Sequence, residues 1–287
     1  MLLLSMGIFG TIGLLRRYIP CSSGLLALTR AVIGAVFLLI LVLLKKQKPD
    51  FSAIRKNLWL LVISGGAIGL NWILLFEAYN HTTVATATVC YYLAPLFLLL
   101  FSPFLGERLT VKKITCIAVA MVGMVFVSGI IDGGMPSFSE LQGILLGIGA
   151  AVLYASVMVM NKKFTPIPAY DKTIMQLGSA AIVILPYLLI TGGFGISGLT
   201  GWQWGNFITL GIVHTGIAYA LYFGSIKDLS AQTIAIFSYI DPAIAVILST
   251  LVLKQPISIG GIAGTLLILG SALYSELPEK QQRAAKK

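Results

Sequence analysis

Ten long apolar runs follow one another along this chain, and they constrain its fold more than any other feature. Turn residues and charged residues separate the runs, and few residues remain outside them. A helix needs about 20 apolar residues to cross a hydrocarbon core of about 30 Å. We expect transmembrane helices at residues 2–16, 25–44, 57–79, 83–104, 110–131, 141–161, 171–191, 203–224, 230–252 and 257–275.

The composition agrees with a membrane protein and not with a soluble domain. Apolar residues make up 57% of the 287 residues, charged residues make up 10%, and the mean hydropathy is +0.94. Soluble globular domains have about 25% charged residues. The runs also lack the period-2 alternation that is typical of strands in a membrane β-barrel. The sequence therefore predicts an all-α integral membrane protein without a separate soluble domain.

The net charge of +10 predicts an orientation in the membrane rather than binding to nucleic acid. With the N-terminus inside, most lysines and arginines fall in the predicted inner loops and in the C-terminal tail. The predicted outer segments carry only Arg16, Arg17 and Lys254. Because Lys and Arg concentrate on the cytoplasmic side of membrane proteins, we expect both termini in the cytoplasm. The predicted location is the inner (plasma) membrane, with lipids and no nucleic acid as partners.

The two halves of the chain carry a weak internal repeat. A shift of 147 residues places Tyr92 on Tyr239 and Pro95 on Pro242 without a gap. Five helices per copy is an odd number, so the copies would cross the membrane in opposite directions, as in many secondary transporters. We therefore expect ten transmembrane helices as two inverted five-helix repeats. These are residues 1–135 and 136–276, followed by a basic cytoplasmic tail at 277–287.

The repeated residues also carry a resemblance to a known family. The chain resembles the EamA branch of the drug/metabolite transporter superfamily in Tyr92-Leu-Ala-Pro95, in Phe104-Leu-Gly106-Glu107-Arg-Leu-Thr110 and Gly123, and in a weaker second copy at Tyr239-Ile-Asp-Pro242, Lys254 and Gly270. The resemblance implies a central cavity between the halves, lined by helices 1, 3, 4, 6, 8 and 9. It also implies export or exchange of metabolites such as amino acids.

Two segments depart from the family pattern. Phe9-Gly10-Thr11 stands where the family often has a Trp-Gly pair, and Lys254 replaces the acidic residue in the second copy. Because helix 1 is expected to line the cavity, the first departure leaves the substrate open.

Two prolines are candidate hinges. Pro95 and Pro242 fall within predicted helices, where a proline removes one hydrogen bond and frees a carbonyl about one turn earlier. Kinks at matching positions of two repeats point to a binding site in transporters. The other interpretation is that proline is common in membrane helices.

Ionisable residues at membrane depth are the main candidates for a functional site, because each is costly there without a cavity or a partner. Counting along the predicted helices places His214 and Asp241 near the membrane centre. One interpretation is a hydrogen-bonded pair that fixes helix packing. The other is that one or both residues bind a substrate amine or carry a proton.

Five further residues are candidates for binding. Arg30 would either hold an anionic group of the substrate, or extend to the lipid headgroups, or form a structural pair. Tyr92 and Tyr239 lie about one turn before the hinge prolines. Asn71 would bond a substrate or a neighbouring helix, and Trp72 is expected to face the cavity rather than a membrane interface.

The motifs that are absent narrow the class of function. The sequence has no phosphate-binding loop and only two histidines, with no spacing typical of metal ligands. We therefore predict no cofactor, no metal and no enzymatic activity. The predicted function is a secondary transporter of a small metabolite, with export favoured over import and with proton coupling as an option. The alternatives are an uncoupled facilitator, a lipid-handling flippase of the same fold or, less favoured, an intramembrane enzyme; the oligomeric state is left at monomer or homodimer.

Overall fold

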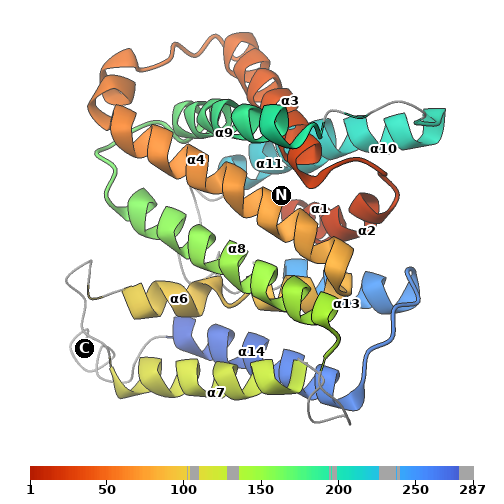
Figure 1. Cartoon of the computed structure of the whole chain (residues 1–287). Coiled ribbons are helices and arrows are strands. Elements are labelled where there is room, and N and C mark those ends of the chain that lie inside the picture. The colour runs from red at the N-terminus through yellow and green to blue at the C-terminus, as the bar shows by residue number, and fades with distance from the viewer. Residues whose placement is uncertain are drawn as a thin grey trace.

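A computed structural model describes the chain except for residues 102, 104–109, 128–135, 194, 196–198, 226–236, 238–239 and 278–287. The described residues form helices and connecting turns, and they contain no strand (Figure 1). The helices of the first half are α1 (Leu2–Gly10), α2 (Ile12–Arg17), α3 (Ser23–Leu44), α4 (Phe51–His81), α5 (Val84–Tyr91), α6 (Ala94–Phe101) and α7 (Val111–Val127). Those of the second half are α8 (Phe138–Lys162), α9 (Ala169–Thr191), α10 (Gly201–Gly211), the π-helix η3 (Ile212–Ile217), α11 (Ala218–Ser225), α13 (Ile240–Leu251) and α14 (Ile259–Glu276).

The lengths of these helices confirm the prediction of an all-α membrane protein. Five helical segments in the described part are long and apolar enough to cross a membrane: Ser23–Leu44, Phe51–His81, Phe138–Lys162, Ala169–Thr191 and Gly201–Phe223. Shorter apolar helices cover Val84–Leu98, Ile114–Val127, Ile240–Leu251 and Ile259–Ser275. The count of ten helices and the inversion of the two halves remain predictions.

Two of the predicted helices are interrupted. The predicted helix 2–16 consists of α1 and α2, which meet at Thr11, and the predicted helix 83–104 contains α5 and α6, which are separated by Tyr92 and Leu93. The second break has a local cause, because Pro95 has no N–H to donate to the carbonyl of Tyr91. Leu96 N–H instead donates to the Leu93 carbonyl at 2.9 Å, in a tighter turn.

Side chains cap the helix ends where the chain enters the bundle. Ser22 accepts a hydrogen bond from Leu25 N–H at the start of α3, and Asp50 accepts one from Ala53 N–H at the start of α4. Ser137 and Glu140 form a capping box at the start of α8. Such caps satisfy N–H groups that would otherwise lack a partner.

The helices pack in a pattern that brings the two halves together. α4 lies between α8 and α9, α3 packs on α9, and α7 packs on α14 (Figure 1). α1 contacts both α13 and α11, and α5 contacts both α13 and α8. At two helix crossings a glycine makes the close contact possible. A Cβ added to Gly10 of α1 would lie 2.7 Å from the carbonyl oxygen of Asp241 in α13. A Cβ added to Gly123 of α7 would lie 2.9 Å from the carbonyl oxygen of Gly264 in α14. These approaches hold α1 against α13 and α7 against α14.

Candidate functional site

Arg30 of α3 is a buried cation that contacts α4 and the π-helix. Arg30 is 4% exposed, so its side chain does not extend to the membrane surface. Its Nε donates a hydrogen bond to Thr215 Oγ1 at 3.0 Å, and its guanidinium lies 4.3 Å from the centre of the Trp72 ring. Its two terminal amino groups make no hydrogen bond to any residue that the structure describes. A buried guanidinium with free donors is suited to an anionic group of a ligand.

Asp241 is the acidic residue of the same region. It lies in the first turn of α13 and is partly buried, and Tyr92 Oη donates a hydrogen bond to its Oδ2 at 2.5 Å. Tyr92 occupies the break between α5 and α6, so the break presents this hydroxyl to α13. The charge of Arg30 acts on Asp241, although the two residues form no ion pair. One positive and one negative side chain therefore face the same interior.

His214 lies in the π-helix and does not pair with Asp241. Its Nε2 is 2.7 Å from Thr11 Oγ1, at the break between α1 and α2, and its Nδ1 is 3.3 Å from the Thr209 carbonyl oxygen. The ring is 4% exposed. π-Helices within α-helices occur frequently at functional sites. The interpretation of a structural His214–Asp241 hydrogen bond is therefore wrong, and each residue has its own partner.

Tyrosines surround the charged residues. Tyr91 stacks on Tyr154 with ring centres 5.3 Å apart and meets Tyr92 edge to face at 5.9 Å. Tyr219 meets Phe9 edge to face, with ring centres 5.6 Å apart. Among the described residues, this region thus combines Arg30, Asp241 and several aromatic faces that carry hydroxyl groups.

The remaining predicted site residues fall at different places. Trp72 is 6% exposed and carries Arg30 on its ring, whereas Asn71 donates a hydrogen bond to the Ala150 carbonyl of α8 at 2.5 Å. Pro95 follows the helix break and lies in the first turn of α6, and Pro242 lies in the first turn of α13. Tyr239 lies outside the described residues.

Sequence reasoning did not predict two sets of polar contacts. The first is Thr11 and Thr215, the partners of His214 and Arg30; as hydroxyl residues in apolar runs they gave only a weak indication. The second joins Arg16 of α2 and Glu77 of α4 through Ser23 and Asn80. Arg16 Nη2 donates to Asn80 Oδ1 at 3.1 Å, and Glu77 Oε2 accepts from Ser23 Oγ at 2.7 Å and from Asn80 Nδ2 at 3.0 Å. We refer to these four residues as the Arg16–Glu77 network.

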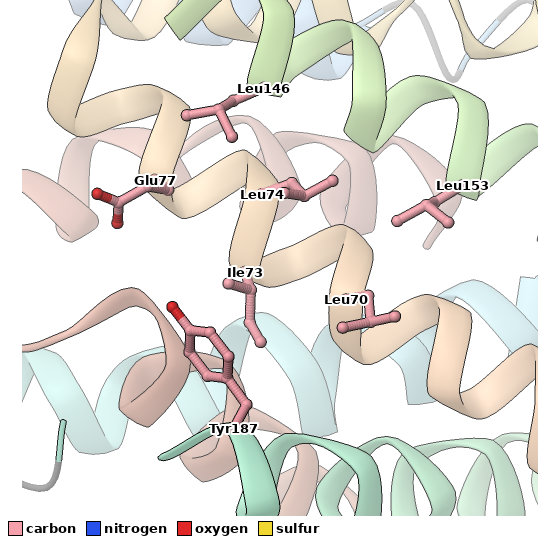
Figure 2. Close-up of a pocket in the computed structure, with 7 residues that line it drawn as sticks. All are labelled: Leu70, Ile73, Leu74, Glu77, Leu146, Leu153 and Tyr187. Atoms are coloured by element: carbon pink, nitrogen blue, oxygen red, sulfur yellow. The ribbon is translucent and has the colours of Figure 1, made fainter. Parts of the chain in front are cut away.

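Two cavities open between helices at the side of the described bundle. The first has a volume of about 370 Å³ and lies between α4, α8 and α9, where Figure 2 shows Leu70, Ile73, Leu74, Glu77, Leu146, Leu153 and Tyr187 around it. The second has a volume of about 350 Å³ and is lined by Met1, Phe37, Leu41, Lys45, Tyr170, Ile217, Ala220 and Leu221. Neither cavity is lined by Arg30, His214 or Asp241.

The described residues hold no group of three or more His, Cys, Asp or Glu side chains that would bind a metal ion.

The fold and the interior define a class of protein: a multi-pass helical membrane protein with a polar, aromatic interior at helix breaks. Comparison with known proteins gives the family within that class. The EamA-like transporter family model matches residues 1–129 and again residues 141–275, so this chain belongs to that family.

Two relatives agree with this assignment, and a solved structure shares the fold. The uncharacterized transporter YxxF of Bacillus subtilis is 32% identical, over 87% of this chain and 79% of its own length. The aromatic amino acid exporter YddG of Ancylobacter novellus is 28% identical, over 75% of this chain and 75% of its own length. A crystal structure with 24% identity matches 94% of each chain with a TM-score of 0.65, which shows a common fold. The protein is therefore a member of a transporter family, and its substrate, direction and coupling are matters for proposal.

Proposed function

We propose that this protein is a secondary transporter that moves an amino acid or a related zwitterionic solute across the cytoplasmic membrane by alternating access, with export as the favoured direction. The interior that contains Arg30 and Asp241 is the proposed binding site. Both termini are proposed to lie in the cytoplasm, which places the Arg16–Glu77 network on the outer side.

The observation that carries this proposal is the arrangement of the two charged residues. Arg30 keeps free guanidinium donors at 4% exposure, and Asp241 lies across the interior with only its Tyr92 hydrogen bond among described contacts. A zwitterion matches this arrangement, because a carboxylate accepts from the guanidinium and an ammonium donates to the carboxylate. The tyrosine faces suit a large apolar or aromatic side chain, which agrees with the name of the YddG relative.

Two observations support an inverted repeat as the basis of alternating access. The family model matches the two halves separately, at residues 1–129 and 141–275. Several helix contacts also join corresponding positions of the two halves, namely α3–α9, α5–α13 and α7–α14. The contact of α1 with α11 likewise corresponds to that of α8 with α4. In transporters built from inverted repeats, the two repeats exchange conformations, and this exchange converts an inward opening into an outward one.

The test is flux of an amino acid panel in proteoliposomes, with and without an imposed pH gradient. We expect uptake or release of at least one aromatic or large apolar amino acid. Arg30→Gln and Asp241→Asn should each reduce the flux by at least tenfold, because each variant leaves one charge of the zwitterion unpaired in a buried site. Asp50→Asn is the matched control, since asparagine still caps α4 and Asp50 lies away from the interior.

The same measurement separates the alternatives. Flux of a panel amino acid that ignores the pH gradient would favour an uncoupled facilitator. No amino acid flux from correctly folded protein, or flux that Arg30→Gln and Asp241→Asn leave unchanged, would contradict the proposed site.

A lipid-handling flippase is the second candidate, and the cavity beside α4 favours it. This cavity is almost wholly apolar, it opens between membrane helices, and Glu77 and Tyr187 are its polar residues (Figure 2). Movement of fluorescent lipids between leaflets in the same liposomes would support the flippase. The transporter proposal requires amino acid flux without such lipid movement.

A further inference from the structure

Thr11 and His214 make a contact whose hydrogen atoms can be assigned from the chemistry of the partners. His214 Nδ1 faces the Thr209 carbonyl oxygen, which only accepts, so Nδ1 must carry a hydrogen for this bond to exist. A neutral ring with hydrogen on Nδ1 has a bare Nε2. That nitrogen must then accept the hydrogen of the Thr11 hydroxyl, 2.7 Å away.

The Thr11 hydroxyl has a second acceptor within reach. Its Oγ1 is 2.8 Å from the Ile8 carbonyl oxygen in the last turn of α1, and one hydroxyl hydrogen cannot serve both acceptors. If a proton from water binds to Nε2, the new N–H donates to Thr11 Oγ1, and the hydroxyl hydrogen turns to the Ile8 carbonyl. Both protonation states are therefore satisfied by the same positions of the heavy atoms.

We propose that Thr11 and His214 form a proton-binding pair that links α1 to the π-helix, a role that rests on the transporter function proposed above. In the neutral state one hydroxyl hydrogen bond joins the two helices. In the protonated state a charge-assisted N–H···O bond joins them, and such bonds are about twice as strong as neutral ones. Proton uptake thus strengthens the tie between the break in the first helix and the π-helix.

The surroundings of the ring contain few other charges. η3 packs against α1, α3, α10 and α11. The residues of α1 and α10 include no acidic or basic side chain, and α11 contributes Tyr219 and Tyr222. α3 contributes Arg30, whose positive charge opposes protonation of His214. Arg30 is already held by Thr215, the residue after His214, so the proton site and the proposed substrate site share one turn of the π-helix.

The position of the hydrogen on the ring is open to direct measurement. The chain has only two histidines, and His81→Gln leaves His214 as the only one. Long-range proton–nitrogen NMR of histidine-labelled protein in lipid nanodiscs distinguishes the two neutral tautomers. We expect hydrogen on Nδ1 in the neutral ring, and hydrogen on Nε2 with a bare Nδ1 would overturn the proposal.

Transport gives the second test. We expect the flux to change with pH between about pH 4 and 7, lower than the range in which histidine ordinarily titrates, because burial and the charge of Arg30 disfavour the protonated ring. Thr11→Val removes the hydroxyl at nearly constant volume, and we expect the ratio of fluxes at the two ends of this range to move away from the wild-type value, because Asp241 then contributes the remaining pH dependence. Thr11→Ser should keep the wild-type ratio. Thr29→Val is the matched control, because among the described residues the Thr29 hydroxyl bonds the Leu25 carbonyl of its own helix and nothing else.

The outcomes separate the two proposals. Hydrogen on Nδ1 without any amino acid flux would contradict the proposed function and leave the tautomer result in support of the pair. Amino acid flux with the same pH profile in wild type and Thr11→Val would contradict the pair and leave the transporter intact.

Discussion

At the scale of single residues, burial separates polar groups that hold helices together from those that remain free for a ligand. Asn71 and Arg30 are both almost fully buried, at 1% and 4% exposure. The Asn71 amide donates a hydrogen bond to the backbone of a neighbouring helix, whereas the terminal groups of Arg30 donate to no described acceptor. The sequence made both residues candidates for binding for the same reason, a polar side chain at membrane depth. Their different partners in the structure separate the two roles.

Asn71 offers a prediction at this scale. Replacing it by alanine removes the hydrogen bond to Ala150, and we expect a loss of stability of about 1 kcal/mol, as for other hydrogen bonds between membrane helices. Thermal unfolding in detergent measures this loss. The KM for the transported amino acid should stay at the wild-type value. A raised KM with unchanged stability would instead assign Asn71 to the substrate.

At the scale of elements, the helices approach so closely that single glycines determine the contacts. α4 packs on α9 at Gly65, where an added Cβ would collide with the carbonyl oxygen of Gln176 and lie 2.6 Å from the Ser179 Cβ. A methyl group there must push the two helices apart. Helix breaks also determine contacts between elements. The break at Thr11 turns this side chain toward the π-helix, and the break at Tyr92 turns that side chain toward α13.

We therefore predict that Gly65→Ala destabilises the protein by about 1–3 kcal/mol, the usual range for overpacking. The unfolding temperature of the purified protein in detergent measures the effect. Gly178→Ala is the matched control on α9, because a Cβ at Gly178 meets nothing within 4 Å. Equal unfolding temperatures for the two variants would show that the α4–α9 approach is looser than described.

At the scale of the whole molecule, the charges of the loops predict the orientation. Cys21 lies between α2 and α3, on the proposed outer side, and it is partly accessible, whereas Cys90 and Cys116 are buried. A reagent that does not cross the membrane should thus distinguish the two sides.

We predict that a membrane-impermeant maleimide labels Cys21 in intact cells. In a Cys21→Ser background, a cysteine at the exposed position of Lys163 should be labelled only after the membrane is permeabilised. Labelling of Lys163→Cys in intact cells, with Cys21 protected until permeabilisation, would reverse the proposed orientation.

The sequence by itself determined the class of fold and most of the helix positions. Long apolar runs without period-2 alternation favour membrane helices, since in lipid a helix bonds every backbone group within its own segment. Arg30, His214 and Asp241 were also identifiable from the sequence, because charge at membrane depth is costly enough to stand out among apolar neighbours.

Only the tertiary structure decided which of these side chains meet. Arg30 and Thr215 are far apart in the chain, as are Tyr92 and Asp241, and their contacts depend on how helices of the two halves pack. The break at Thr11 depends on packing too, because α1 crosses α13 at Gly10 and Thr11 faces the π-helix. Local pattern fixes where a helix forms and which residues are costly to bury, but the partner of a buried polar group is set by distances between helices that no single run of sequence contains.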